Sequence, residues 1–189
     1  MPPRVKITKD DVINATLNIV KTEGITNISA RRIAKGLKSS VQPIFTHFES
    51  MEELTNVATM KIYEQYKNSM IEASKKEKLP YKAMGMAYIK FAKYYPEYFK
   101  VLFMQKSDKS AMDFMLSDNT GNNVVEVGTE MSGLSLEKQK EFHIKVWMFT
   151  HGIASLMATK TIEMSDSEIE DLLGNTVREM LIGFKKEEM

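Results

Sequence analysis

The side chains best suited to recognition chemistry in this 189-residue chain lie between positions 29 and 47. Gln42 carries an amide that can pair bidentately with adenine, and Val41 and Thr46 carry methyl groups that can contact the methyl of thymine. Arg31 can bind guanine or a phosphate oxygen. The pattern therefore indicates recognition of double-stranded DNA.

Two short helices joined by a tight turn must present these side chains. Ser29 is a suitable N-cap for a helix that ends near Leu37, and a second helix runs from about Ser40 to Phe45. Ser29 and Ser40, with the backbone amides that follow them, are natural phosphate ligands. Helical spacing predicts that the apolar side chains turned inward are Ile33, Ala34, Leu37, Ile44 and Phe48. The side chains left outside on the second helix are Ser40, Val41, Gln42, Phe45, Thr46 and His47.

The charge of the chain is unevenly distributed. Residues 1–50 hold eight basic and four acidic side chains, a net charge of +4, so the other 139 residues sum to −3. Such asymmetry is expected where one end of a chain binds a polyanion, although a solvated basic surface explains the charge alone equally well. Lys6, flanked by Arg4 and Lys9, is expected to add phosphate contacts from an N-terminal arm.

The remainder of the chain has helical periodicity nearly throughout. Thr8 with Asp11 and Ser50 with Glu53 form capping-box patterns, which begin a helix ending at Gly24 and a long helix to about residue 75. Further helices are expected at about 80–94, 96–105, 109–117, 121–132, 135–161 and 166–186. We therefore predict an all-α fold of about nine helices, with a helix-turn-helix domain at 1–50 and a helical domain at 51–189.

Residues 8–55 resemble the DNA-binding headpiece of the TetR family of bacterial regulators. The resemblance rests on a capped helix ending at Gly24, then Ile25-Thr26-Asn27-Ile28-Ser29 and Arg31-x-Ile33-Ala34, then Ser40-x-x-x-Ile44-Phe45-x-His47-Phe48-x-Ser50-x-Glu52-Glu53-Leu54. It implies a three-helix headpiece whose DNA contacts are Ser29, Arg31, Ser40, Val41, Gln42, Phe45, Thr46 and His47. It also implies that residues 51–189 bind a ligand and dimerise, and that the homodimer is a repressor released from a palindromic operator by a small molecule.

Three positions depart from the family pattern. Lys38 stands where the family usually has Gly in the turn between the helices, so a left-handed backbone there would cost ~1 kcal/mol or more. Phe45 replaces the usual Tyr and Met51 the usual Lys, and each exchange removes a phosphate contact. The alternative is therefore a helical interaction or sensor module that no longer binds DNA specifically.

Stripes on the last two expected helices are the candidates for a dimer interface. The first stripe has mostly small residues, which permit close helix approach, and it consists of Met148, Gly152, Ser155 and Thr159. An apolar stripe on the last helix consists of Ile169, Leu172, Leu173, Thr176, Met180 and Phe184. The resemblance implies a four-helix interface whose residues include Met148, Gly152, Ser155, Thr159, Leu173, Thr176 and Met180. Packing within one chain is the alternative.

Aromatic residues beyond the headpiece are the candidates for a ligand pocket. Trp147, His151 and Gly152 resemble the Trp…His-Gly signature of a subset of TetR-like C-terminal domains. The candidate pocket residues are Tyr88, Phe91, Phe99, Phe103, Trp147 and His151. An ordinary core explains aromatic residues at helical spacing as well. The 15 methionines suit a pocket for a small apolar or amphipathic ligand, and they equally suit a loosely specified core.

The sequence disfavours an enzyme and a membrane protein. The three histidines, at positions 47, 143 and 151, lack metal-ligand spacing, and nucleophile elbows and phosphate-binding glycine loops are absent. The chain has no Cys, so thiolate metal sites are excluded, and no cofactor is expected. No apolar run approaches the ~18–20 residues of a membrane span, and no signal peptide is apparent, so we expect a cytoplasmic location.

Overall fold

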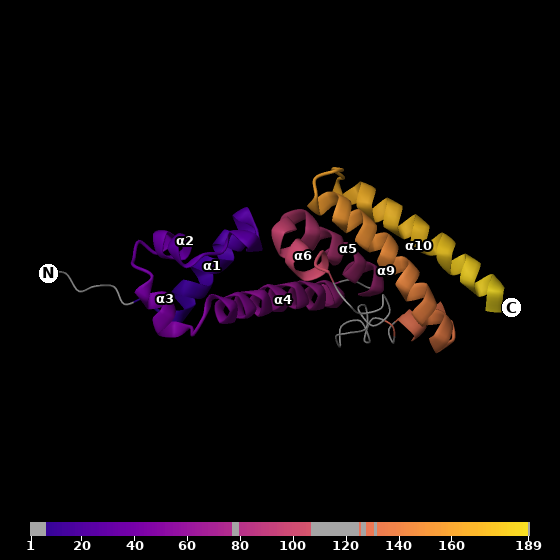
Figure 1. Ribbon diagram of the computed structural model, residues 1–189. Coiled ribbons are helices and arrows are strands. Elements are labelled where there is room, and N and C mark those ends of the chain that lie inside the picture. Colours follow the sequence, from indigo (N-terminus) through magenta and orange to yellow (C-terminus); the bar gives the residue numbers. More distant parts are fainter. Residues whose placement is uncertain (1–6, 77–79, 107–124, 126–127, 131, 189) are drawn as a thin grey trace. The chain divides into compact units, whose positions relative to one another are not determined.

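The computed structural model describes residues 7–76, 80–106, 125, 128–130 and 132–188, and within these ranges it contains helices and no strand (Figure 1). Eight α-helices and one 3-10 helix in the described ranges confirm the prediction of an all-α fold of about nine helices. Lys6, the expected helix at 109–117 and most of the one at 121–132 lie outside the described residues. In the described ranges no helix combines the length and the apolar character that a membrane span requires.

The described chain divides into two compact units. One contains the residues up to 66 together with 95–105, and the other contains 67–94 and the residues from 106 onward. The first unit extends past residue 50 because α4 (Met51–Lys76) begins in it and because α6 (Pro96–Phe103) belongs to it. The domain boundary expected between residues 50 and 51 therefore falls inside the first compact unit.

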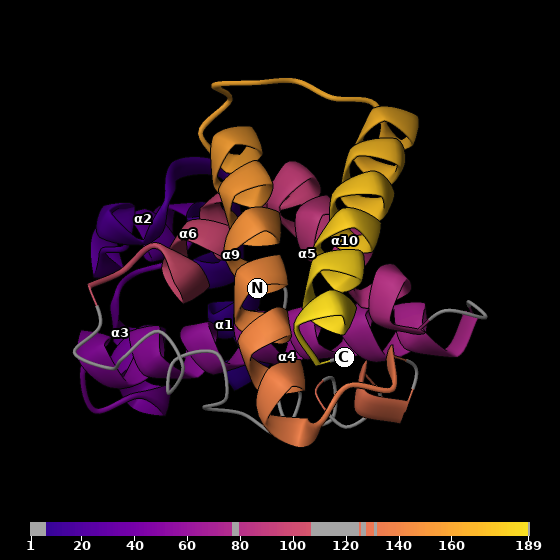
Figure 2. The same ribbon diagram turned by 90° about the vertical axis from the view of Figure 1, so that its right-hand side faces the viewer.

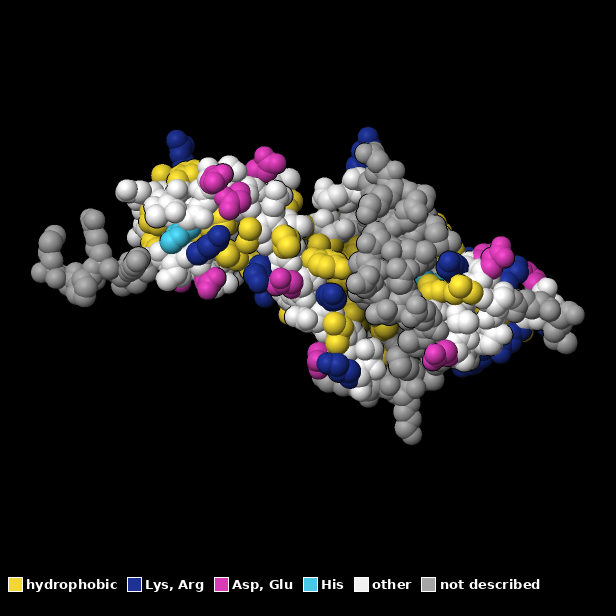
Figure 3. All heavy atoms as spheres, turned by 90° about the horizontal axis from the view of Figure 1, so that it is seen from below, with side chains coloured by type: hydrophobic (Ala, Val, Ile, Leu, Met, Phe, Trp, Pro, Cys, Tyr) yellow, Lys and Arg dark blue, Asp and Glu magenta, His cyan; other side chains and the backbone are white. Residues whose placement is uncertain are grey.

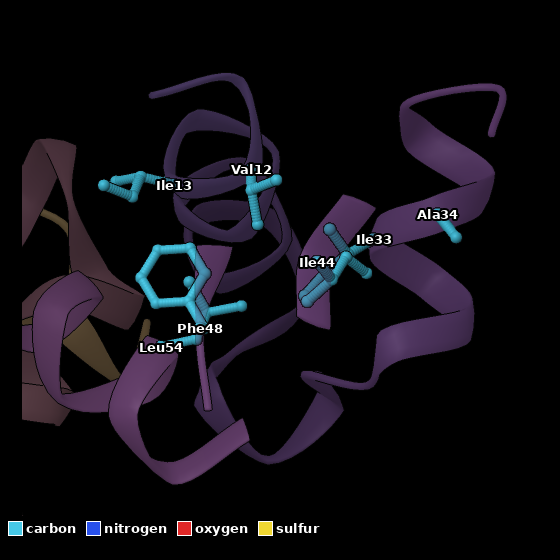
Figure 4. Packing of buried hydrophobic residues seen from close by; sticks show 7 residues of the cluster. All are labelled: Val12, Ile13, Ile33, Ala34, Ile44, Phe48 and Leu54. Carbon is cyan, nitrogen blue, oxygen red and sulfur yellow. The ribbon is translucent and has the colours of Figure 1, made fainter. Parts of the chain in front are cut away.

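The first unit is organised around α1 (Lys9–Glu23), the 3-10 turn η1 (Ile25–Asn27), α2 (Ala30–Gly36) and α3 (Gln42–His47). Its core is aliphatic apart from one ring, and it consists of Val12, Ile13, Ile33, Ala34, Ile44, Phe48 and Leu54 (Figure 4). Burial of these side chains from four helices is the main force that fixes the short helices, which are too short to be stable alone.

Helix α6 packs on α1 within the first unit. Tyr98 of α6 is 5% exposed, and its hydroxyl donates a hydrogen bond of 3.0 Å to the backbone carbonyl of Leu17. Burial raises the pKa of Tyr98, which keeps the hydroxyl protonated and able to donate. Gly24 closes α1 with φ of 86°, and a Cβ at that position would lie only 2.9 Å from Oε2 of Glu97. The positive φ favours glycine there, whereas the carboxylate of Glu97 is the end of a flexible side chain and could move away.

The second unit contains α5 (Pro80–Tyr94), α9 (Leu136–Ala158) and α10 (Asp166–Glu188). Helices α9 and α10 lie side by side, and α5 contacts both (Figure 2). Asp166 accepts hydrogen bonds from Lys93 at 2.8 Å and pairs with Lys90 at 3.0 Å, which lowers the pKa of its carboxyl. These pairs are largely solvent-exposed, so they add little stability compared with the packing of the helices.

The helix starts follow the capping patterns of the sequence. Thr8 Oγ1 accepts a hydrogen bond of 3.1 Å from the amide of Asp11, whose carboxylate accepts one of 2.8 Å from the amide of Thr8. These hydrogen bonds from Thr8 lower the pKa of Asp11. Ser50 Oγ caps α4 in the same way through the amide of Glu53, at 3.1 Å. The predicted first residues of α1 and α4 are confirmed.

Candidate DNA-binding surface

Helices α2 and α3 are anchored by their inner faces. Ile33 in α2 and Ile44 in α3 are both fully buried, and Phe48, just after α3, is 2% exposed. Ala34 is buried with them, whereas Leu37 is only half-buried and packs at the edge of the cluster. The predicted inward set is thus confirmed, with Leu37 at its margin. One side of α3 is held by apolar packing, which leaves its other side free to face a ligand.

The turn that links α2 to α3 has a left-handed residue. Lys38 has φ of 51°, as the sequence led us to expect for this position. Its amide donates to the carbonyl of Lys35 at 3.2 Å, and the amide of Ser39 donates to the carbonyl of Ala34 at 2.9 Å. This pair of hydrogen bonds is a Schellman motif, which usually has Gly at the position that Lys38 occupies. The strain, ~1 kcal/mol, is the cost of placing a cation in the turn.

The outer face of α3 is exposed. Val41 and Phe45 are 39% and 50% exposed, and Gln42 between them is exposed as well. The hydroxyl of Thr46 is exposed but donates to the carbonyl of Gln42 at 3.0 Å, so its methyl remains for contact. The helix begins at Gln42 rather than near Ser40, because the two residues before it stay in the turn. Ser40 and Val41 therefore lie in the turn that precedes α3, next to the exposed N-terminal end of that helix.

Two neighbouring arginines at the start of α2 differ in how they are engaged. Arg32 binds the carboxylate of Glu23 and donates to the side-chain oxygen of Asn27 at 3.1 Å. Arg31 is exposed, and no described residue forms an ion pair or a hydrogen bond with its side chain. Arg31 is therefore available to a phosphate or a base, while Arg32 stabilises the junction of α1 and α2.

Two of the expected contact residues are already engaged inside the unit. His47 is half-buried, and its Nε2 lies 3.0 Å from the carbonyl oxygen of Ile7, so this nitrogen carries a proton and donates it. Ser29 caps α2 by accepting a hydrogen bond of 3.4 Å from the amide of Arg32. Their structural roles leave Nδ1 of His47 and the hydroxyl proton of Ser29 for any contact with DNA.

The exposed surface of the first unit is chemically mixed. Figure 3 shows basic, acidic and hydrophobic side chains interspersed over one face of it. Lys9 lies over the ring of Phe48 at 4.9 Å, so one of the cations is held by a cation–π contact. On the face seen in Figure 3 the side chains of the first unit form no broad basic patch.

The residues expected at a dimer interface have different environments. Met148 is 54% exposed, Gly152 and Thr159 are exposed, and Ser155 is half-buried, so the stripe on α9 is largely accessible in one chain. On α10, Thr176 and Met180 are half-buried. Leu173 is 3% exposed and lies against α5, where its Cδ2 would be 3.1 Å from a Cβ on Gly85. Leu173 therefore belongs to the interior of the unit rather than to an exposed face.

The aromatic residues expected to line a pocket belong to different compact units. Phe99 and Phe103 lie in the first unit, with ring centroids 5.1 Å apart, whereas the other four lie in the second. There the hydroxyl of Tyr88 lies 2.9 Å from Nδ1 of His151, which stacks on Trp147 at 5.1 Å. Burial lowers the pKa of His151, so its neutral form is favoured. These contacts are those of a packed cluster, and Phe91 is buried on the same helix as Tyr88.

A cavity of about 350 Å³ in the second unit has a different lining. It lies among α5, α9 and α10, and none of the six expected aromatic residues lines it. One face of α9 contributes residues four or three positions apart, namely Gln139, Phe142, Val146 and Thr150. Glycines on the neighbouring helices leave the space open, and among them Gly174 has no atom within 4 Å of the place where a Cβ would lie.

Gln139 is the chemically unusual residue of this lining. Its side chain is fully buried, and Oε1 accepts a hydrogen bond of 2.7 Å from Ser132. Its Nε2 has no hydrogen-bond partner among the described residues. A buried amide donor left without a partner costs about 1–3 kcal/mol. This residue carries no sequence signal, because it stands between Lys138 and Lys140 in a stretch typical of a solvated helix face.

No family model matches the chain. The chain is similar to the uncharacterized HTH-type transcriptional regulator YobS of Bacillus subtilis (strain 168), with 23% identity over 177 residues. The alignment spans 91% of this chain and 90% of that protein, so it includes both compact units. A helix-turn-helix is the arrangement that α2, the Lys38 turn and α3 form here.

Proposed function

We propose that this protein is a homodimeric transcriptional regulator of the TetR type, which binds a palindromic operator through α2, the Lys38 turn and α3. In this proposal it is a repressor, and a small molecule bound in the second unit releases it from DNA. Two features of the first unit support the DNA-binding role together: α3 is anchored by the fully buried Ile44, and its opposite side leaves Val41, Gln42 and Phe45 exposed. The name of the similar Bacillus subtilis protein points the same way.

Dimerisation follows from the size of the DNA-reading element. Helix α3 has six residues, which can reach only a few base pairs, so useful specificity needs a second copy on a second half-site. The exposed stripe on α9, with Met148 and Gly152, is the surface that we assign to the partner copy. Leu156, 42% exposed on the same helix, extends that stripe.

Selection from double-stranded DNA with a random central segment tests the proposal, with the full chain as bait. We expect enrichment of a palindrome whose half-sites lie about one helical turn, ~34 Å, apart. Affinity for it should fall steeply as salt is raised, because phosphate contacts release counterions. Binding that stays blind to sequence, or no enrichment at all, would instead favour the helical interaction module.

The two arginines of α2 give a matched pair for the same assay. Arg31→Ala should lower operator affinity by about 1–3 kcal/mol if Arg31 binds a base, or lower the salt slope by about one if it binds a phosphate. Arg32→Ala should leave the salt slope nearly unchanged, because Arg32 is engaged with Glu23 and Asn27.

Gln42→Ala should relax base preference at one position of each half-site, and an unchanged preference would remove Gln42 from the set of reading residues.

Glycine substitutions test the assigned interface. Gly152→Leu places a large side chain on the exposed stripe of α9, and no atom of the chain lies within 4 Å of the new Cβ. We expect it to weaken the dimer in sedimentation experiments while the monomer stays folded. Gly36→Leu, in α2 of the first unit, is the matched control, since it too has open space around a helical position. An intact Gly152→Leu dimer would mean that another face forms the interface.

A further inference from the structure

We propose that the cavity among α5, α9 and α10 binds an uncharged, mostly apolar small molecule that carries one hydrogen-bond acceptor, and that Nε2 of Gln139 donates to this acceptor. The inference rests on the proposed function for the regulatory role of the ligand, although the binding itself can be tested without DNA. It also moves the ligand site from the aromatic cluster of Tyr88 and Trp147 to a different face of α9.

The unpartnered atom of Gln139 is identified by the hydrogen bonds around it. Ser132 Oγ accepts a hydrogen bond of 3.1 Å from the amide of Leu134, so its own proton is available to Gln139, 2.7 Å away. The atom of Gln139 that faces Ser132 is therefore the acceptor, Oε1, and the atom left over is the NH₂ group. Because this group is a donor only, the molecule that completes it must supply an acceptor, such as a carbonyl, ether or hydroxyl oxygen.

The remainder of the lining defines the rest of the molecule. Phe142 and Val146 of α9 are apolar, and the hydroxyl of Thr150 already donates to the carbonyl of Val146 at 2.8 Å. Lys82 is paired with Glu170 at 2.6 Å, and Arg178 is exposed. No cation of the described lining is thus buried beside Gln139, so a carboxylate there would be left without charge compensation. The ligand that fits is neutral at the Gln139 end and apolar elsewhere.

The volume suits a small molecule. About 350 Å³ lies at the lower end of the ~300–1,000 Å³ that ligand pockets usually enclose. Gly174 of α10 is in the lining, and open space lies where its Cβ would be. The unpartnered donor in this lining lowers stability, and a ligand with an acceptor would compensate for it.

A pair of probes of the same shape tests the assignment: 2-acetylnaphthalene, which has a carbonyl acceptor, and 2-ethylnaphthalene, which has none. Calorimetric titration of the full chain without DNA should give tighter binding of the acetyl compound by about fivefold, the usual value of one hydrogen bond. The side-chain NH₂ signals of Gln139 in ¹H–¹⁵N spectra should shift with the acetyl compound and shift much less with the ethyl compound. Equal affinities, or no binding of either probe, would overturn the inference.

Two variants test the hydrogen bond from Gln139 and the volume of the cavity separately. Gln139→Leu should bind both probes with equal affinity, because the donor is gone while the shape is nearly kept. Gly174→Leu should weaken both probes at least tenfold, whereas Gly183→Leu, which lies outside the described lining on the same helix, should bind them as the natural chain does. A Gly174→Leu chain that binds the probes normally but changes its dimer dissociation constant would show that a second copy covers this space, and the proposal would fail.

Operator binding measured on the same samples keeps the two proposals apart. Loss of probe preference with intact operator binding overturns only the assignment of the cavity. Probe binding that requires Gln139, in a chain that selects no operator, overturns only the DNA-binding proposal. When both hold, saturating 2-acetylnaphthalene should change operator affinity in the natural chain and leave that of Gly174→Leu unchanged.

Discussion

The first unit and the α9–α10 region differ in one buried polar group. In α1, Thr16 is fully buried and its hydroxyl donates to the carbonyl of Val12 at 2.8 Å, within a core that is otherwise apolar. In α9, Gln139 is fully buried beside a cavity, and its NH₂ group has no partner among the described residues. In α1 the buried hydroxyl already has its acceptor. In α9 the NH₂ group of Gln139 lacks an acceptor among the described residues, and it lies beside a cavity.

This difference matches what each region would have to do. A helix that reads DNA must keep its side chains in fixed positions, which requires close packing behind it. A region that responds to a ligand needs a state that is less stable without the ligand than with it, so that binding can shift the population. The contrast leads to four predictions, in order of decreasing effect.

Truncation of a core side chain should be much more costly in the first unit than at the cavity. Ile44→Ala should lower the free energy of unfolding by roughly 3–4 kcal/mol, because it opens a void in a filled core. Val177→Ala should cost about 1 kcal/mol or less, since Val177 borders space that is already empty. Urea denaturation followed by circular dichroism measures both. Similar costs for the two variants would contradict the contrast in packing.

Acid should destabilise the protein through His143 of α9. Burial lowers the pKa of His143 to about 4, whereas its value in the unfolded chain is 6.5. The unfolded chain therefore binds the proton more tightly, so the stabilisation is complete above pH 6.5 and is lost as the pH falls from 6.5 towards 4. The loss should reach about 3 kcal/mol. His143→Gln should flatten the unfolding free energy over this interval, and an unchanged slope would exclude His143 as its source.

Removal of the unpartnered amide should stabilise the second unit. Gln139→Leu deletes a buried donor that costs about 1–3 kcal/mol and loses one hydrogen bond to Ser132, for a net gain of about 1 kcal/mol in unfolding free energy. Thr16→Val, which deletes a satisfied buried hydroxyl in the first unit, should not stabilise the protein. Thermal unfolding of the two variants side by side would decide whether the contrast holds.

Two lysines in matching turns give the prediction with the smallest expected effect. Lys38 after α2 and Lys160 after α9 both have positive φ, 51° and 57°, and both occupy the same position of a Schellman motif. Lys38→Gly and Lys160→Gly should each stabilise the chain by roughly 0.5–1 kcal/mol, because Gly adopts this conformation without strain. Only Lys38→Gly should also weaken operator binding and reduce its salt slope by about one. Equal effects of both on DNA binding would separate Lys38 from the DNA-binding surface.

The sequence was sufficient for those features that depend on neighbouring residues. Thr8 with Asp11 and Ser50 with Glu53 mark helix starts because capping is local, and the spacing of Ile33, Ala34 and Ile44 marks the buried faces. The left-handed turn at Lys38 was suggested only by the resemblance to a family that usually has Gly at this position.

The cavity could not be predicted, because it depends on which side chains are missing where α5, α9, α10 and the helical residues around 128 meet. Gly85, Gly128 and Gly174 come from distant parts of the chain, and no periodicity shows that they adjoin one space. Gln139 carries no sequence signal either, since a glutamine between two lysines usually lies in solvent. Leu173 was misplaced because an apolar stripe on a helix does not tell whether its own chain or another covers it.

The hydrogen bond from Tyr98 to Leu17 joins residues 81 positions apart, and it has a consequence for synthesis. The segment that carries it, α6, belongs to the first unit although the α5 segment of the second unit precedes it in the chain. The nascent helix-turn-helix therefore cannot complete its packing until about residue 105 has left the ribosome. Until then the surface of α1 that covers Tyr98 remains exposed to solvent. Ribosome-bound chains halted before α6 should be cut by protease in α1, and those halted well after it should resist.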